Sequence, residues 1–243
     1  TIREAGESLG TREWSPQQPI PSGTYDLIIM GHVINELFSG DIRRRSDFIE
    51  QVMKSLSPKG TLMIIEPALR ETSRALLSVR DVLVSRGYAV RAPCLYRGAC
   101  PALIKESDWC HAERDWEMPS LVETVARQVG LHKESLKMSY LAVAPKAQAW
   151  AEPPEGNVFR IVSEALPGKG RLRFMGCGPS GRIGLSLQEK HVSDRNKLFE
   201  HLHRGDVIRV TSEEERGDGV ALGEESTVEI IARAGQSVPQ ETK

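Results

Sequence analysis

Four cysteines are the whole cysteine complement of this chain of 243 residues. Cys94, Cys100 and Cys110 lie close together, whereas Cys177 stands alone between two glycines. The opening TIREAGESLG lacks the basic and apolar regions of a secretory signal, and no stretch approaches the roughly 20 apolar residues that span a membrane. We therefore expect a soluble, intracellular protein without a membrane partner. In a reducing compartment, clustered cysteines more often bind metal or do chemistry than form disulfides.

The spacing of the cysteines bears on the kind of metal. Five residues separate Cys94 from Cys100, nine separate Cys100 from Cys110, and 66 separate Cys110 from Cys177. Structural zinc usually takes cysteines two residues apart, and no such pair occurs here. Iron–sulfur cubanes accept looser loops, and Cys-Pro pairs end many ferredoxin runs. The spacing favours iron weakly and leaves zinc open. His111 could also be a ligand, although four cysteines already complete a set.

Polar residues after two strand-like runs form a second candidate site. His32, Asn35 and Glu36 follow the run YDLIIM, and Glu66 ends the run TLMIIE. Open α/β sheets bind ligands at the carboxyl ends of their strands. These residues could therefore face a cleft, or they could simply cap a helix and end a strand.

The elements that must position these residues alternate in the first half of the chain. Short apolar runs predict buried strands, and apolar residues at helical spacing predict helices. In chain order these are a strand over 25–30, a helix over 42–56, a strand over 61–66, helices over 73–86 and 120–129, and a strand over 136–144. This alternation of strands and helices predicts a parallel α/β sheet.

The second half of the chain has a different sequence pattern. After a linker over 150–156, short strand-like runs alternate with Gly-rich turns, at 159–166, 171–175, 182–187 and 207–211. We expect a small β domain or barrel over 149–243, with part of the acidic stretch 213–243 mobile. The segment 176–181 fits G-x-G-x-x-G, but the alternating RIGLSLQ that follows it predicts a hairpin turn rather than a dinucleotide loop.

The charge pattern is local rather than global. The net charge is -1, whereas residues 160–209 contain ten Lys and Arg against five acids, a difference of ten minus five, or +5. A solvated surface and an RNA-binding face of a β module both fit this excess.

Several segments together carry a family resemblance. YDLIIMGHVINEL, KGTLMIIEPAL, APC, CP, DWCH, SYLAVA and a Gly-rich β tail with Cys177 occur in this order over nearly the whole chain. In this, the chain resembles the methyltransferase-like small-ribosomal-subunit assembly proteins of mitochondria and bacteria.

The resemblance implies a 4Fe-4S cluster ligated by Cys94, Cys100, Cys110 and Cys177. It also implies a Rossmann-like class I methyltransferase-type sheet over residues 1–148, with an insertion at about 91–119 carrying three ligands, and a small C-terminal β domain over 149–243. The cluster would then join the two domains and fix the angle between them.

An S-adenosylmethionine site is a further expectation. No Gly-rich loop precedes Tyr25, so we expect either that the natural N-terminal strands are missing or that the module is degenerate. In a longer parent protein, Met30, Gly31 and His32 would form another wall of the cofactor pocket. We identify no catalytic residue.

We therefore expect an iron–sulfur, methyltransferase-like factor that binds small-subunit rRNA in ribosome assembly. Two alternatives are an active S-adenosylmethionine-dependent rRNA methyltransferase and a zinc-stabilised RNA-binding module. We expect a monomer off the ribosome, in the bacterial cytoplasm or, alternatively, in the mitochondrial matrix.

Overall fold

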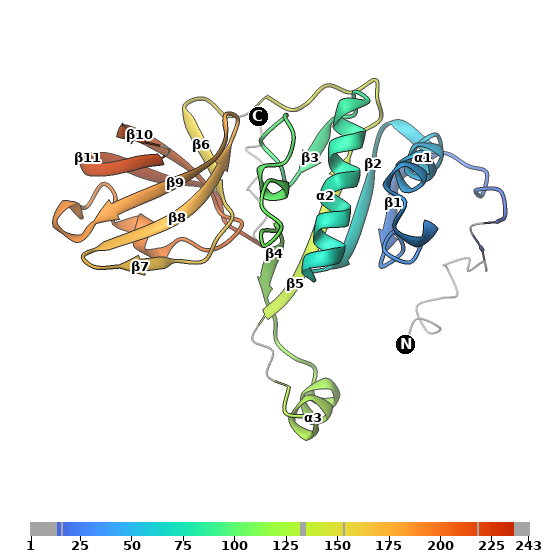
Figure 1. Cartoon of the computed structure of the whole chain (residues 1–243), viewed down its shortest axis with the longest axis horizontal. Coiled ribbons are helices and arrows are strands. Elements are labelled where there is room, and N and C mark those ends of the chain that lie inside the picture. The colour runs from blue at the N-terminus through green and yellow to red at the C-terminus, as the bar shows by residue number, and fades with distance from the viewer. Residues whose placement is uncertain (1–13, 16, 132–134, 153, 218, 236–243) are drawn as a thin grey trace, which may run out of the picture.

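A mixed sheet of five strands forms the N-terminal half of the molecule (Figure 1). The computed structural model describes residues 14–15, 17–131, 135–152, 154–217 and 219–235. The strands lie in the order β1-β2-β5-β3, and β4 also pairs with β5. β1 (Tyr25–Gly31) and β2 (Leu56–Pro67) are parallel, whereas β5 (Ser135–Val143) runs antiparallel to β2, β3 (Val90–Ala92) and β4 (Ala112–Asp115).

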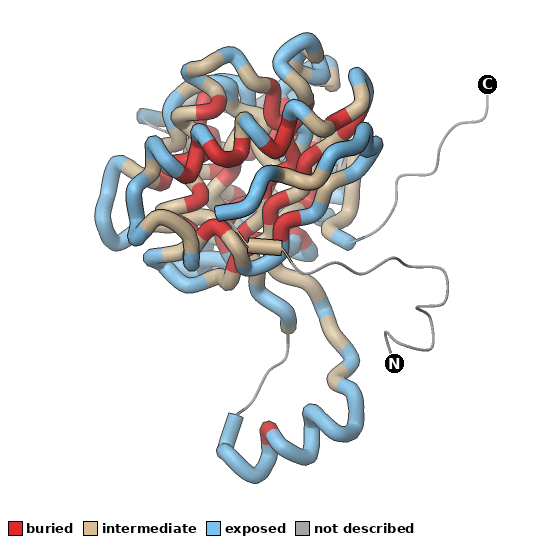
Figure 2. Tube along the Cα trace, turned by 90° about the vertical axis from the view of Figure 1, so that its right-hand side faces the viewer, coloured by how far each residue is buried: buried red, intermediate tan, exposed pale blue. Residues whose placement is uncertain are grey.

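Three α-helices accompany this sheet in the described residues. α1 (Ile42–Met53) begins after Asp41, whose carboxylate accepts the backbone N–H of Arg44 at 3.0 Å. α2 (Arg70–Ser85) lies across β2 and β5 and buries its apolar side there. α3 (Ser120–Gln128) projects away from the body, and only Ala126 is buried in it (Figure 2). No helix among the described residues is long and apolar enough to cross a membrane.

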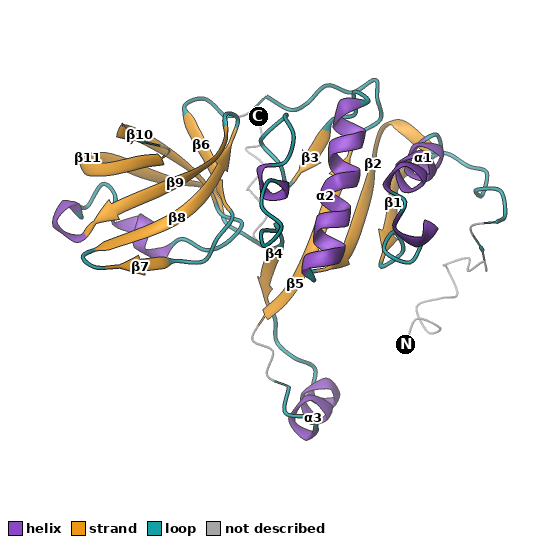
Figure 3. Cartoon of the chain, in the orientation of Figure 1, coloured by secondary structure: helices purple, strands orange, loops and turns teal. Residues whose placement is uncertain are grey.

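The C-terminal half is a closed β-barrel (Figure 3). Its sheet has the order β6-β10-β11-β9-β8-β7, and an additional pairing of β6 with β8 closes a ring of five strands. The strands are β6 (Asn157–Ile161), β7 (Leu166–Gly168), β8 (Arg171–Gly178), β9 (Gly181–Gln188), β10 (Val207–Arg216) and β11 (Gly219–Ala232). Short 3-10 turns complete the chain: η1 (Phe38–Gly40), η2 (Pro101–Leu103), η3 (Glu189–His191) and η4 (Lys197–His201).

Each half has its own hydrophobic core. The core of the N-terminal half includes Ile49, Leu62, Val79 and Leu83, which are fully buried between the helices and the sheet. The core of the barrel is a separate cluster built from alternate residues of its strands together with Phe199 of η4. Because the two clusters share no residue, other contacts must hold the halves together.

The predicted Rossmann-like class I methyltransferase-type sheet is wrong. The molecule is mostly β, and β1 with β2 is the one parallel pair in the N-terminal sheet of the described residues. The reason is that a buried apolar run fixes the place of a strand and not its direction. The run at 136–144 forms β5, but this strand runs antiparallel to β2. The parallel sheet expected from the alternation of strands and helices therefore does not form.

Three local predictions can also be compared with the structure. The helix predicted over 42–56 ends at Met53, and β2 already begins at Leu56. The acidic stretch predicted to be partly mobile contains β11, a strand of 14 residues, while residues 236–243 lie outside the described part. The hairpin turn at 176–181 is confirmed, because Gly178 pairs with Gly181 across β8 and β9.

Candidate metal centre

The four cysteines line one small cavity between the two halves. Cys94, Cys100 and Cys110 come from the loops between β3 and β4, and Cys177 comes from β8 of the barrel. The cavity has a volume of about 50 Å³, several times the roughly 10–15 Å³ that one water molecule requires. All four side chains are free thiols. The structure thus brings together all the cysteines that the sequence analysis singled out.

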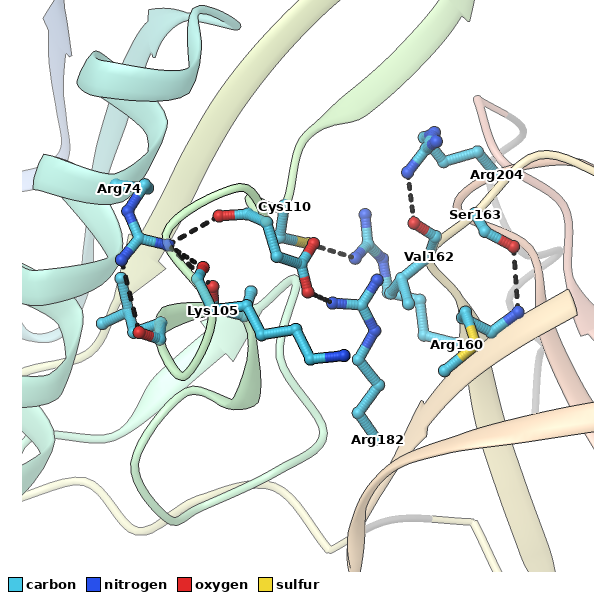
Figure 4. Close-up of polar contacts among 12 residues, drawn as sticks. Arg74, Lys105, Cys110, Arg160, Val162, Ser163, Arg182 and Arg204 are labelled. Atoms are coloured by element: carbon cyan, nitrogen blue, oxygen red, sulfur yellow. Dashed lines mark hydrogen bonds and ion pairs between the residues drawn. The ribbon is translucent and has the colours of Figure 1, made fainter. Parts of the chain in front are cut away.

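Arg74 of α2 fixes the path of the loop that carries Cys100 and Cys110. Its guanidinium donates to the carbonyl oxygens of Lys105 and Asp108, each at 2.7 Å (Figure 4). It also donates to the carbonyl oxygens of Ala102, at 3.0 Å, and Leu103, at 3.3 Å. One planar group with several donors therefore holds much of this loop against the helix.

Arg80 and Asp81 hold the preceding part of the loop. The guanidinium of Arg80 donates to the carbonyl oxygens of Tyr96 and Gly98, and it pairs with the Asp81 carboxylate at 2.6 Å. The same carboxylate accepts the backbone N–H of Cys100. Side chains of one helix thus contact the cysteine-bearing loop at three places.

Two arginines flank the cysteine of the barrel. In the register of the strands, Cys177 lies opposite Arg160 of β6 on one side and opposite Arg182 of β9 on the other. The Arg160 guanidinium donates to Cys110 Sγ at 3.8 Å, and Arg182 forms an ion pair with Asp108 (Figure 4). These contacts join the barrel to the loop across the cavity.

One of the three arginine charges around the cavity is not balanced by a carboxylate among the described residues. Arg80 is 1% exposed and Arg160 is 6% exposed. Arg80 pairs with Asp81 and Arg182 with Asp108, but Arg160 has no carboxylate partner among the described residues. A buried cation without a counter-charge is costly, so an anionic group in the cavity would stabilise Arg160.

Burial favours the neutral form of three of the four thiols. Burial raises the pKa of Cys100 and of Cys177 to about 12. Burial also raises the pKa of Cys94, against the opposing effect of the Arg80 charge. Because metals bind the thiolate, a metal here must displace these protons. The four thiolates would then supply a counter-charge to the Arg160 guanidinium.

Among the described residues, no group of three or more His, Cys, Asp or Glu side chains is arranged to hold a metal ion. A tetrahedral zinc site requires its ligands to converge on one point, with Zn–S distances of about 2.3 Å. The cysteines instead stand around a cavity.

His111 also lines the cavity. Its ring stacks on Trp109 with 6.1 Å between centroids, and its Nδ1 is buried without a hydrogen-bond partner in the described residues. Burial, followed by the charge of Arg204, lowers the pKa of His111 to about 4. The imidazole is therefore neutral at physiological pH.

The residues predicted to contact S-adenosylmethionine lie elsewhere. Met30 is buried in the N-terminal core and lines an apolar groove beside β1, while Gly31 and His32 are exposed and line neither that groove nor the cysteine cavity. Among the described residues that line the groove, polar side-chain groups come from Tyr25, Ser55 and the indole N–H of Trp14, which donates to the carbonyl oxygen of Pro19. The proposed contact of Met30, Gly31 and His32 with S-adenosylmethionine stays a prediction.

Glu66, the other candidate residue at this end of the sheet, has a structural role. It is 1% exposed, and its carboxylate accepts the backbone N–H of Ile34 at 2.8 Å. Burial raises the pKa of Glu66 despite this hydrogen bond. Neither interpretation open from the sequence, a carboxylate facing a cleft or one that ends the strand, included this role of holding the chain after β1.

The arginines of the cavity are functional residues that the sequence analysis missed as such. Arg160 and Arg182 entered it only as part of the basic excess. A signal was present, because Arg160 interrupts an otherwise apolar strand, NVFRI, at a position where a core residue is expected. A basic residue inside a buried strand needs a partner, and this pointed to a site.

Comparisons with known proteins add a family. The profile of the family described as "Mitochondrial small ribosomal subunit Rsm22" matches residues 8–220. No curated protein matches the chain. One similar solved structure, titled "Structure of murine DNA binding protein bound with ds DNA", has 12% sequence identity and a TM-score of 0.23, and the likeness covers 45% of this chain and 76% of that one. Because the family profile spans most of the chain, the protein belongs to the Rsm22 family of the mitochondrial small ribosomal subunit.

Proposed function

We propose that this protein is an iron–sulfur factor of the mitochondrial small ribosomal subunit that binds the rRNA of that subunit. Membership of the Rsm22 family ties it to the subunit. The observation that carries the cluster is the cavity, which is lined both by four thiols and by a buried arginine, Arg160, that has no carboxylate partner among the described residues. On the same family grounds we propose the mitochondrial matrix, rather than the bacterial cytoplasm, as its compartment.

The donor set fits a 4Fe-4S cluster. Such clusters are held by four cysteine thiolates, here Cys94, Cys100, Cys110 and Cys177. With its four thiolates the bound cluster carries net negative charge, which is what the buried Arg160 requires. When bound, the cluster supplies a covalent link between the loop and the barrel.

The protein's own residues prepare this link. Arg74 and Asp81 hold the loop that carries three of the thiols, and Arg182 pairs with Asp108 across the junction. These contacts join the loop to α2 and to the barrel through protein groups alone. A cluster would make the junction rigid, so that both halves present one surface to the ribosomal subunit.

The barrel offers cations for RNA phosphates. Lys169, Arg171, Arg173 and Lys190 are exposed, and they form no ion pair among the described residues. They lie together because Arg171 pairs with Gln188 across β8 and β9, shortly before Lys190. Glutamates of the β10–β11 hairpin face Arg171 and Arg173 across a groove, so we assign the phosphate contact to the β7–β8 edge. Such contacts weaken as salt rises, because binding releases counterions from the RNA.

The cluster is tested by purification without oxygen, followed by an absorbance spectrum and analysis for iron, sulfide and zinc. We expect a brown protein with four iron atoms per chain, and loss of iron in Cys94→Ser and Cys177→Ser. Ser180→Ala, at the exposed tip of the β8–β9 hairpin, is the control and keeps the iron. A colourless protein with stoichiometric zinc would overturn the cluster and support a zinc-stabilised RNA-binding module.

RNA binding is tested with transcripts of mitochondrial small-subunit and large-subunit rRNA at several salt concentrations. We expect tighter binding to the small-subunit transcript, and a shallower salt dependence when Lys169, Arg171 and Arg173 are changed to Gln. The control changes Arg195 and Lys197 to Gln, because these exposed cations pair with Glu225 and Asp194. Equal affinity for both transcripts would contradict specific binding to the small subunit.

A further inference from the structure

Cys177 stands in a row of three residues on adjacent strands of the barrel. Arg160 of β6 pairs with Cys177 of β8, and Cys177 pairs with Arg182 of β9. Residues directly opposite each other on paired strands share a face of the sheet, and all three line the cavity. The pairing of β6 with β8 is also the one that closes the barrel. The closure therefore places Arg160 on one side of this thiol, and the β8–β9 hairpin places Arg182 on the other.

The two arginines differ in how their charge is balanced. Arg182 forms an ion pair with Asp108, and Arg80, on the other side of the cavity, pairs with Asp81. Arg160 is 6% exposed, and its hydrogen bond to Cys110 Sγ is directed at a cysteine of the cavity. The charge of Arg160 is thus the one that still requires an anion within the cavity.

We propose that Arg160 is the charge-balancing positioning residue of the cluster: its guanidinium, held between Cys110 and Cys177, stabilises the bound cluster and most strongly its reduced state. This inference rests on the cluster proposed above. The reduced cluster carries one more negative charge than the oxidised cluster, so a fixed neighbouring cation stabilises it more. Net charge and hydrogen bonds to the sulfurs set the reduction potential of such clusters.

Arg160 and Arg182 also differ in what the removal of their charge would leave behind. Removing the Arg182 charge leaves Asp108 as an unpaired anion, whereas removing the Arg160 charge leaves no carboxylate behind among the described residues. Arg160→Gln is therefore the cleaner test of charge. Arg160→Lys keeps the charge but loses the planar group that donates several hydrogen bonds.

The experiment is a redox titration of the whole chain, purified without oxygen, with dithionite as the one-electron reductant and the spectrum of the reduced cluster as the readout. For Arg160→Gln we expect the reduced state to be at least tenfold less favoured, a shift of about 59 mV to more negative potential. We expect Arg160→Lys to restore most of this shift. Arg195→Gln, an exposed and paired arginine of the barrel, should leave the potential unchanged.

A second readout is retention of iron against the chelator bathophenanthroline. Loss of a residue that supports metal ligands commonly weakens binding 10–100-fold, and we expect Arg160→Gln to lose iron at a correspondingly lower chelator concentration. Equal potentials in wild type and Arg160→Gln would overturn the inference. If Arg160→Gln fails to hold iron, Arg160→Lys decides: an intact cluster supports the role of charge, and loss of the cluster rejects it. A wild type without iron would instead reject the proposed cluster itself.

Discussion

The carboxylate of Asp81 accepts the backbone N–H of Cys100, with its two oxygens 2.9 and 3.1 Å from that nitrogen. The same carboxylate pairs with Arg80, which is 1% exposed. A helix residue thus positions a thiol-bearing loop residue through the backbone, leaving the sulfur free to face the cavity. The loop therefore owes its shape to α2 and not only to a metal.

Asp81→Asn is expected to destabilise the metal-free protein by about 1–3 kcal/mol, because the buried Arg80 loses its carboxylate partner. The measurement is urea-induced unfolding of the chelated protein. Asp47→Asn is the matched control, because Asp47 pairs with the much more exposed Arg86 and surface pairs contribute about 0–1 kcal/mol. Equal losses in the two variants would contradict a special role for Asp81.

Arg74→Ala should loosen the loop while leaving α2 in place. The variant loses hydrogen bonds to four loop carbonyls, whereas alanine is a good helix former. We expect faster amide hydrogen exchange over 100–110 and little change over 76–83. Arg70→Ala, at the exposed start of the same helix, is the control. Unchanged exchange in the loop would show that other contacts hold it.

The sequence located most strands and helices but not the topology. Apolar runs bounded by turn residues identify β1, β2 and β5 because burial of a strand requires such runs. The direction of β5 depends on long-range pairing with β2, which no local pattern encodes. The predicted parallel sheet fails at this step. Barrel closure likewise depends on pairing between β6 and β8, strands that a local pattern does not connect.

The sequence analysis identified the cysteines of the site but not its arginines. Cysteines are rare in the chain, so their clustering could be noticed from type and spacing. Arg160 is 17 residues from Cys177 in sequence and Arg182 is five, and both lie on other strands than Cys177. The strand register brings both beside it. Glu66 shows the converse: its chemistry suggested a ligand site, and its burial makes it a structural anchor for Ile34.

Glu66→Gln should change how stability depends on pH. Burial raises the pKa of Glu66 above its ordinary value, so the folded protein keeps a proton that the unfolded chain releases above a pH of about 4.3. The stability that comes from this raised pKa is fully present below the ordinary value and is lost as the pH rises through the folded value. The free energy of unfolding of wild type should therefore fall, relative to Glu66→Gln, as the pH rises from acid towards neutral.

The measurement is urea unfolding of both proteins across this range. Glutamine keeps an oxygen that can accept the N–H of Ile34, so the variant removes the charge and retains the anchor. Glu36→Gln, at an exposed position, is the matched control for the exchange of a carboxylate for an amide. A constant difference between wild type and Glu66→Gln at all pH values would show that the pKa of Glu66 is not raised on folding.

Phe199→Ala should destabilise the barrel selectively. The ring is fully buried and packs edge-to-face on Phe174, with 5.1 Å between centroids and an interplanar angle of 84°. Truncation of a buried phenylalanine costs about 3–5 kcal/mol. Because the two cores share no residue, we expect exchange of the barrel amides to accelerate more than exchange of β2 and α2. The neighbouring Leu198→Ala, 39% exposed, is the control with a small expected effect. Uniform acceleration across both halves would instead show that they unfold as one cooperative unit, joined tightly enough at the cysteine cavity that the loss of barrel packing reaches the N-terminal sheet.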